Sequence, residues 1–263
     1  MKLTVLIENT ASREDLICEH GLSLYLEAAG KRILFDAGQS DAFAGNAARL
    51  GVDLKNVDLA ILSHGHYDHG GGMAAFLSIN DHAPLYAHEK AFGRHFSGSE
   101  REIGLSPALP AHPRLCRTGD VFPLSKGLTL LSCNEKRPLY PLSNEHMHRM
   151  EGTELAPDPF FHEQYLLIEE KGKRILISGC SHKGVLNLLS WLQPDILIGG
   201  FHWKHLTGEG ESARQLNAYA QALKQFPARL YTCHCTGEAA YRHLKPLMGE
   251  QLSYLATGTA IEL

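Results

Sequence analysis

The segment from residue 63 to residue 72 carries the side chains best suited to chemistry. It reads Ser-His-Gly-His-Tyr-Asp-His-Gly-Gly-Gly, so three imidazoles and one carboxylate lie within six residues. Alternate residues of an extended backbone share a side, which lets His64 and His66 face one metal ion. The turn that follows can bring Asp68 and His69 to a second ion, and the glycines let the backbone pass close to both. We therefore expect a metal site here.

A polar surface turn is the alternative interpretation, since the chain holds 16 histidines. The context of the segment argues against it. The apolar run Leu-Ala-Ile-Leu at 59–62 predicts a buried strand directly before the histidines, and a helix is expected directly after them. Sheets that alternate with helices keep their sites at the carboxyl ends of strands. The position of the segment therefore favours a metal site.

Two divalent ions at such a site predict a hydrolase. Water that bridges two ions has its pKa lowered from ~15.7 towards ~7, so hydroxide is available at neutral pH. Asp68 is the predicted catalytic residue, because it can orient this hydroxide while it ligates an ion. An ester, amide, thioester or phosphoester of a small molecule fits this chemistry.

The composition limits the partners of the chain. A hydrophobic content of 44% and a charged content of 21% over 263 residues are ordinary for a globular protein. The net charge of -4 provides no basic field for nucleic acid. Glu8 interrupts the N-terminus too early for a secretory leader, and no apolar run approaches the ~20 residues of a membrane span. We expect no membrane partner, a cytoplasmic location and six reduced cysteines, and the sequence does not indicate an oligomeric state.

Short strands alternate with helices along the chain. Strands are predicted at 3–8, 22–28, 32–35, 58–63, 195–198, 229–232 and 251–256, and helices at 41–50, 72–79, 184–192, 211–226 and 238–248. The run Gly-Lys-Arg-Ile-Leu occurs at 30–34 and again at 172–176, each time as the second arm of a hairpin, which predicts two similar halves. Strands, hairpins and helices in this arrangement predict one α/β (α+β) domain over residues 1–263, an αββα sandwich of two mixed sheets with outer helices.

Two segments, 88–113 and 134–162, are rich in proline, histidine and charge and lack periodicity, so we expect surface loops or lids. Several histidines in and beyond them are predicted to be surface residues, of which one or two can reach the substrate: His88, His95, His112, His146, His148, His162, His205 and His243.

The sequence His-x-His-x-Asp-His at 64–69 resembles the signature of the metallo-β-lactamase superfamily. Within it, the chain is similar to the dihydropterin ribofuranosylaminobenzene phosphate synthase-like metal-dependent hydrolases. That likeness rests on Glu-His-Gly-Leu-Ser at 19–23, Leu-Phe-Asp-Ala-Gly at 34–38, Gly-Cys-Ser-His at 179–182, Gly-Gly-Phe-His at 199–202 and Cys-His-Cys-Thr-Gly at 233–237. These motifs extend over essentially the whole chain.

The resemblance implies two ions per chain, commonly zinc, with iron or manganese as alternatives. The first ion would be held by His64, His66 and His182, and the second by Asp68, His69 and His234. Most members carry an acidic bridging ligand after the second hairpin, where this chain has Ser178 and Cys180. Cys180 is therefore either a thiolate ligand or a small core residue, while a helix cap for His182 and a core position for His234 remain alternatives.

Four further residues are expected near the ions. Asp36 ends a strand and can accept a ring N–H from a liganding histidine, with a helix cap as the alternative, and His20 is placed in the same outer layer. His202 is predicted to bind substrate or to serve as a general acid, although a structural role fits equally. Lys183, next to His182, would suit a phosphorylated substrate.

Two other functions fit parts of the pattern. A di-iron oxidoreductase uses the same fold, but its members carry a carboxylate between the first two histidines, where this chain has Gly65. A non-catalytic metal or redox sensor would use Cys233, His234 and Cys235 as an oxidisable clip. The hydrolase interpretation is favoured over both.

Overall fold

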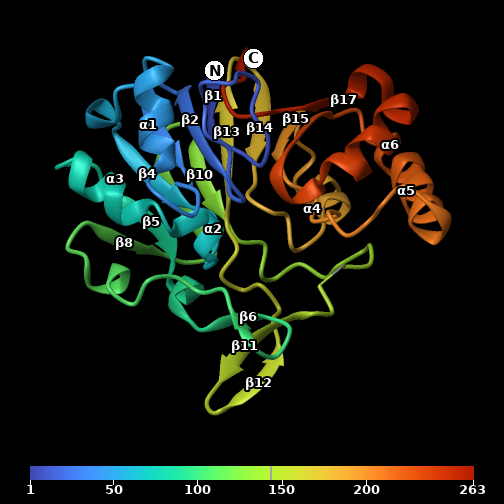
Figure 1. The fold of residues 1–263 in the computed structure, drawn as a ribbon, viewed down its shortest axis with the longest axis horizontal. Helices are drawn as coiled ribbons and strands as arrows, with labels where there is room; N and C mark the ends of the chain where they lie inside the picture. The colour runs from blue at the N-terminus through green and yellow to red at the C-terminus, as the bar shows by residue number, and fades with distance from the viewer. Residues whose placement is uncertain (143) are drawn as a thin grey trace.

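Two seven-stranded sheets pack face to face in the computed structural model, which describes residues 1–142 and 144–263 (Figure 1). The first sheet has the order β18 (Ala260–Glu262), β1 (Lys2–Ile7), β2 (Ser23–Ala28), β3 (Lys31–Phe35), β4 (Leu59–Leu62), β5 (Leu85–His88), β8 (Leu115–Thr118). The second has the order β17 (Leu252–Tyr254), β16 (Arg229–Thr232), β15 (Ile196–Gly199), β14 (Lys173–Ile177), β13 (Tyr165–Glu170), β10 (Leu128–Leu131), β9 (Val121–Ser125).

Helices cover the outer face of each sheet, as Figure 1 shows. α1 (Ala42–Arg49) and α3 (Met73–Ile79) lie on the first sheet, and α4 (Val185–Leu192), α5 (Gly210–Leu223) and α6 (Glu238–Met248) lie on the second. A short helix, α2 (Tyr67–Gly70), lies within the metal-site segment, and single 3₁₀ turns complete the list: η1 (Leu54–Asn56), η2 (Glu89–Phe92), η3 (Leu109–Ala111), η4 (His234–Thr236) and η5 (Gly249–Gln251). The predicted αββα sandwich of mixed sheets is confirmed.

The alternation of apolar side chains along the strands explains the layers. Ile33 and Ile175 face the space between the sheets, whereas the next residues, Leu34 and Leu176, face the helices on opposite sides of the molecule. All four are at most 2% exposed, so both faces of each central strand are buried. Three apolar layers therefore hold the four structural layers together.

The repeated Gly-Lys-Arg-Ile-Leu run marks equivalent places in the two sheets. β2 and β3 form an antiparallel hairpin, and β3 then pairs in parallel with β4. β13 and β14 form the matching hairpin, and β14 pairs in parallel with β15. The two halves are therefore similar in topology, and the carboxyl ends of their parallel strands lie at the same end of the sandwich.

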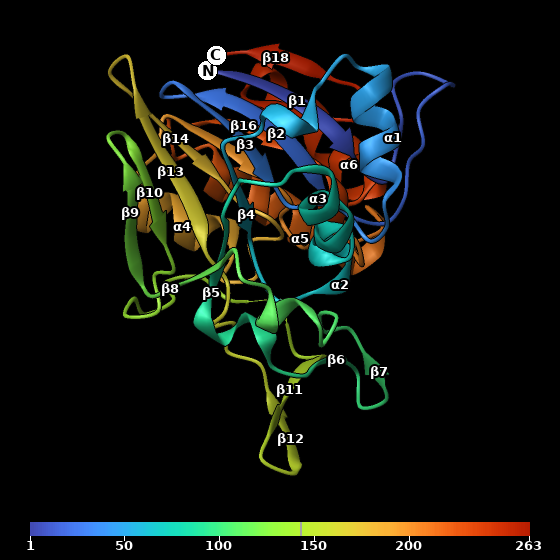
Figure 2. The ribbon, with the colours of Figure 1, turned by 90° about the vertical axis from the view of Figure 1, so that its left-hand side faces the viewer.

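The two segments predicted as loops or lids contain a third sheet. It has the order β12 (Glu154–Pro157), β11 (Met147–Glu151), β6 (His95–Ser97), β7 (Arg101–Glu102). The β11–β12 hairpin projects from the body in both ribbon views (Figures 1 and 2). These strands are short, and most of their side chains are half-buried or exposed. The sequence therefore shows no regular alternation of apolar and polar residues in these segments.

Strands β5, β8, β9, β10 and β18 also went unpredicted. The predicted strand at 251–256 is shorter in the structure, which assigns it to Leu252–Tyr254. Among the described residues, the structure has no helix that is both long and apolar enough to cross a membrane.

Candidate metal centre

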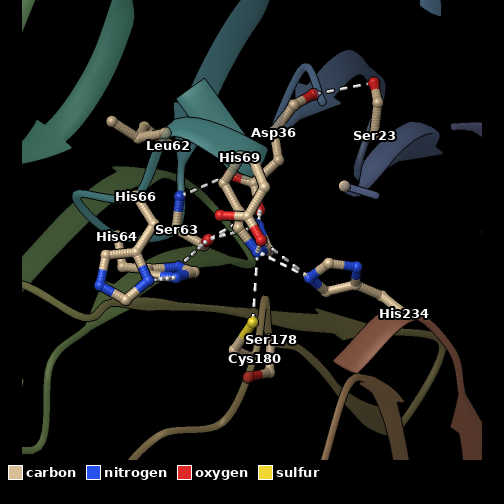
Figure 3. A network of polar contacts seen from close by, with 12 residues as sticks. Ser23, Asp36, Leu62, Ser63, His64, His66, His69, Ser178, Cys180 and His234 are labelled. Carbon is tan, nitrogen blue, oxygen red and sulfur yellow. Dashed lines mark hydrogen bonds and ion pairs between the residues drawn. The ribbon is translucent and has the colours of Figure 1, made fainter. Parts of the chain in front are cut away.

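The candidate site is built on turns that follow the carboxyl ends of parallel strands. Asp36 follows β3, segment 63–69 follows β4, the turn 178–182 follows β14, His202 follows β15 and His234 follows β16. Figure 3 shows side chains from both sheets converging on one small volume. His69 and His234, 165 positions apart in the sequence, are thereby brought within 3.2 Å of each other.

The first group of possible ligands consists of His64, His66 and His182. Each offers a ring nitrogen, and these nitrogens all lie within 4.8 Å of one another. His64 Nε2 is 3.0 Å from His66 Nδ1, and the buried Nε2 of His182 has no hydrogen-bond partner among the described residues. Burial holds the pKa of all three imidazoles well below its usual range, so each keeps a free lone pair at neutral pH.

The second group consists of Asp68, His69, Cys180 and His234. His69 Nε2 lies 3.2 Å from His234 Nε2, 3.2 Å from Cys180 Sγ and 4.0 Å from Asp68 Oδ2. His234 Nε2 lies 3.4 Å from the same carboxylate oxygen. Burial opposes the charge on Asp68, but His69, His20 and His234 outweigh it and hold the pKa of Asp68 well below its usual range.

Asp36 and Ser63 orient two of these rings. Asp36 Oδ2 accepts the Nδ1–H of His69 at 2.7 Å and the hydroxyl of Ser63 at 2.7 Å. Ser63 Oγ in turn lies 2.8 Å from His64 Nδ1, whose N–H it accepts because its own hydrogen goes to the carboxylate. Both rings therefore turn Nε2 towards the centre of the site. Asp36 does not cap α1, whose N-cap is Asp41.

The donor set fits a divalent metal ion. One proton on His69 Nε2 can serve only one of the three atoms around it, His234 Nε2, Cys180 Sγ or Asp68 Oδ2, whereas one cation can serve all three. Burial by itself lowers the pKa of His69, but the carboxylates of Asp36 and Asp68 outweigh this effect and raise the pKa to about 9. This buried position therefore attracts positive charge. Imidazole, thiolate and carboxylate together suit zinc and other first-row transition ions.

His182 and His234 lie in the cluster and not in the alternative positions considered above. The N-cap of α4 is Gly184, so His182 does not cap this helix. The Nδ1–H of His234 is 2.8 Å from Asn9 Oδ1, which leaves Nε2 free to face His69. His234 also has a backbone φ of 51°, a left-handed conformation that directs this side chain inward from the end of β16.

His20 and His202 both line the cleft beside the cluster. His20 Nε2 is 3.2 Å from Asp68 Oδ2, and the ring of His20 lies 4.9 Å from that of His234. The ring of His202 is 4.3 Å from that of His182, and its buried Nδ1 has no partner among the described residues. Its place at the cleft leaves the expected substrate contact open.

Lys183 has a different environment from the one expected. Its ammonium donates to the carbonyl of Ser132 at 2.6 Å and to Asn134 Oδ1 at 2.7 Å, and it does not line the cleft. Burial lowers the pKa of Lys183. In this geometry Lys183 ties the turn that carries His182 to the end of β10, and its contact with substrate stays a prediction.

The cleft itself contains basic groups that the sequence did not single out. It has room of about 40 Å³, and Arg101 and Lys204 lie on its wall together with Tyr67 and Met147. Arg101 Nη2 donates to Tyr67 Oη at 2.8 Å, and Lys204 Nζ lies 3.4 Å from His20 Nε2. Positive charge therefore surrounds the entrance to the candidate metal centre.

Three histidines expected at the surface are buried: His88, His95 and His162 are 1%, 3% and 2% exposed. The expectation was wrong because the third sheet folds the segments that hold His95 and His162 against His66. Asp158 binds both, with Oδ2 2.7 Å from His95 Nδ1 and 3.2 Å from His162 Nε2. An acid and a histidine four positions apart, 158 and 162, were the one available signal. The remaining predicted surface histidines are exposed or half-buried: His112, His146, His148, His205 and His243.

Comparison with known proteins identifies the family. Residues 16–209 match the metallo-β-lactamase superfamily, and the chain belongs to it. It is 28% identical over 257 residues to an uncharacterised protein of Methanocaldococcus jannaschii, covering 93% of this chain and 94% of that protein. It is 27% identical over 270 residues to the 7,8-dihydropterin-6-methyl-4-(β-D-ribofuranosyl)-aminobenzene-5'-phosphate synthase of that organism, covering 93% and 90%.

A solved structure agrees with these relationships. The crystal structure of a metal-dependent hydrolase of the β-lactamase superfamily superimposes with a TM-score of 0.80 and 25% identity, covering 100% of this chain and 99% of the other. The resemblance that the sequence motifs predicted, to the superfamily and to the phosphate synthase-like group, is therefore confirmed.

Proposed function

We propose that the protein is a hydrolase that uses two divalent metal ions to cleave a bond in a small, negatively charged molecule. Zinc is the ion we expect first, and iron(II) or manganese(II) are the alternatives. The observation that supports the proposal most strongly is the convergence on His69 Nε2 of a second imidazole, a thiol and a carboxylate. Hydrogen bonds alone cannot satisfy all of these atoms, whereas one bound cation can.

Each residue has a role in this proposal. One ion would be held by His64, His66 and His182, and the other by Asp68, His69, His234 and, in place of the usual acidic bridge, Cys180. The ions would supply Lewis acidity and hydroxide at neutral pH. Asp68, kept ionised by its neighbours, would orient the attacking oxygen.

The chain's own geometry disfavours the di-iron oxidoreductase. A Cβ added at Gly65 would lie 2.2 Å from the carbonyl oxygen of Ala91 and 2.9 Å from His95 Nε2. The carboxylate that di-iron members carry at this position therefore has no room. This clash supports the hydrolase.

Charge favours a phosphoester over the other candidate bonds. Arg101 and Lys204 line the cleft, and Glu102 beside Arg101 is paired with Arg94 instead. An anionic group of the substrate could bind these two cations while its scissile bond lies at the metal centre. The name of the Methanocaldococcus jannaschii relative, a 5'-phosphate synthase, agrees with a phosphorylated ligand.

Elemental analysis tests the metal site. The purified protein should contain close to two divalent ions per chain, and His64→Ala with His66→Ala should remove the first. The matched control is His82→Ala with His243→Ala, a pair outside the cluster, which should keep both ions. Unchanged metal content in the His64, His66 variant would refute the assignment.

A substrate panel tests the activity. Zinc-, iron(II)- and manganese-loaded protein would be assayed on small phosphomonoesters, phosphodiesters, thioesters, carboxylic esters and amides. We expect phosphoesters to be preferred, and Arg101→Gln with Lys204→Gln to lower kcat/KM for them about tenfold, or about 1.4 kcal/mol, while neutral esters change little. Lys136→Gln with Arg137→Gln on the exposed surface is the charge-matched control. Metal-replete protein that hydrolyses none of these would favour the sensor or a synthase reaction.

A further inference from the structure

Histidines that bind metal need a partner for the ring nitrogen that faces away from the ion. At this centre, four of the five rings have one among the described residues. The pairs are His64 with Ser63, His69 with Asp36, His182 with Asn144, and His234 with Asn9. His66 is the exception. Its Nδ1 faces His64 Nε2 at 3.0 Å, which leaves Nε2 as the outer nitrogen.

An unused acceptor lies beside His66. His95 is 3% exposed, and its Nδ1 is 2.7 Å from Asp158 Oδ2. Because an ionised carboxylate only accepts hydrogen bonds, His95 must carry its hydrogen on Nδ1 and a lone pair on Nε2. That Nε2 is buried and has no partner among the described residues.

The position of His95 directs this lone pair at the metal-site segment. His66, His95 and His162 each bring a ring nitrogen within 4.8 Å of the others, and the rings of His66 and His95 meet edge to face at 5.7 Å. His95 Nε2 also lies 2.9 Å from where a Cβ would sit on Gly65, the residue between the first two histidines. A small rotation of either ring, or one bridging water, completes the contact.

His162 anchors the same network to the backbone. Its Nε2–H donates to Asp158 Oδ2 at 3.2 Å, and its Nδ1 accepts the backbone N–H of Gly65 at 3.0 Å. The ring of His162 is 4.0 Å from that of His95. One carboxylate therefore fixes two imidazoles, of which one holds the peptide next to His66 and the other presents a free lone pair.

We propose that His95, fixed by Asp158, is a positioning residue that accepts the Nε2–H of His66 and so presents His66 Nδ1 to the first metal ion. The inference rests on the proposed function. Metal binding through Nδ1 requires the ring hydrogen of His66 to be on Nε2, and a buried N–H without an acceptor is costly. His95 removes that cost. The third sheet thereby contributes to the metal centre without providing a ligand.

Three variants test the proposal through metal affinity, measured by competition with a chelator. His95→Phe keeps the ring but removes the acceptor, and should weaken the first ion about 10–100-fold. His95→Gln restores an acceptor near the position of Nε2 and should stay within about threefold of wild type. Asp158→Asn can donate to His95 Nδ1 and so shift its hydrogen to Nε2, which should weaken the first ion even though the His95 ring remains. If His95→Phe fails to fold, the other two variants still carry the test.

A spectroscopic signal and a control complete the experiment. In the zinc-loaded protein, ¹⁵N-edited NMR should show a slowly exchanging Nε2–H on His66 that is lost in His95→Phe. The control variant is His88→Phe, at another buried histidine. It should lose packing interactions but keep its affinity for both metal ions. Wild-type affinity in His95→Phe, equal losses in His95→Phe and His95→Gln, or a third ion bound at His95 would overturn the proposal. Wild-type protein that binds no metal would instead refute the proposed function and the inference with it.

Discussion

We predict that Cys180 takes the place of the acidic bridge that most members of the superfamily carry. Its Sγ is 3.2 Å from His69 Nε2, and burial raises the pKa of this thiol. A dication beside it would reverse that effect, since a coordinating thiol is deprotonated by its metal. Two dications about 3.5–4 Å apart need anionic ligands, and the ionised Asp68 supplies one negative charge. The thiolate therefore has an electrostatic reason to ligate.

Replacing Cys180 with serine tests this role. If the thiolate is a ligand, Cys180→Ser should weaken the second ion more than about tenfold and the first much less, because a hydroxyl stays neutral at pH 7. Chelator titrations of both sites would measure this. Alkylation of the metal-loaded protein should also spare Cys180, and removal of metal should expose it. Cys133→Ser, at a buried cysteine outside the cluster, serves as the control. Equal affinities in the variant and wild type would mean that Cys180 is only a core residue.

Local sequence patterns identified the site residues that directly follow predicted strands. Segment 63–69 and Asp36 follow predicted strands, so their convergence could be expected from parallel strand ends. His95 and Asp158 are 63 positions apart and lie in segments without periodicity, and no pattern in either segment indicates the other. Lys183 is the opposite case, because it adjoins His182 in sequence while its ammonium donates to Ser132 and Asn134.

At the scale of elements, the turn after β4 determines whether the ligands converge. Gly65 passes so close to the backbone of Ala91 that a Cβ would lie 2.2 Å from its carbonyl oxygen, a distance real structures do not contain. The 3₁₀ turn η2, which precedes the third sheet in the chain, and the metal-site turn are thus packed backbone against backbone. The glycines of the motif are required by this contact as well as by access to the ions.

Gly65→Ala should therefore separate the two elements. We expect a loss of stability of about 1–3 kcal/mol from overpacking, together with weaker binding of the first ion, because His66 must move with the backbone. Gly93→Ala is the matched control, since a Cβ there meets His95 Nε2 at an ordinary 3.6 Å. Urea unfolding and metal titration measure both effects. A Gly65→Ala protein as stable as Gly93→Ala would contradict the packing argument.

The central strands and outer helices were predictable because their apolar residues follow the pattern that burial on the expected faces requires. The β2–β3 and β13–β14 hairpins repeat one sequence run, and that run also predicted two similar halves. The third sheet was not predictable, because its strands are short, mostly exposed or half-buried, and show no alternation of apolar and polar residues. Its four strands include one of only two residues, β7.

At the scale of the whole molecule, the sandwich collects an unusual number of buried neutral histidines at one end. Burial lowers the pKa of five of them, and that of His162 falls to about 4. The five are His64, His66, His162, His182 and His234. His69 is the opposite case, with a pKa of about 9 that Asp36 and Asp68 raise against the effect of burial. These shifts make the stability of the metal-free protein depend on pH.

The sign of that dependence follows from which state binds more protons. For the five lowered groups, the unfolded chain takes up protons near its pKa of ~6.5 while the folded chain does not, so their contribution is present above pH ~6.5 and is lost as the pH falls below it. His69 contributes below pH ~6.5, and that contribution is lost as the pH rises towards 9. The stability that these five groups lose in acid outweighs the stability that His69 loses in base.

Metal-free protein should therefore lose stability steeply below pH 6.5, by about 1.4 kcal/mol per pH unit for each proton taken up, and only gently above it. Urea unfolding in chelator between pH 5 and pH 8.5 would measure this, with His64→Ala plus His66→Ala expected to reduce the acid slope. Zinc should stabilise the protein more at pH 7.5 than at pH 5.5, since protons compete for the same lone pairs. A metal-free protein equally stable at pH 5.5 and pH 7 would show that these imidazoles are not buried in their neutral form.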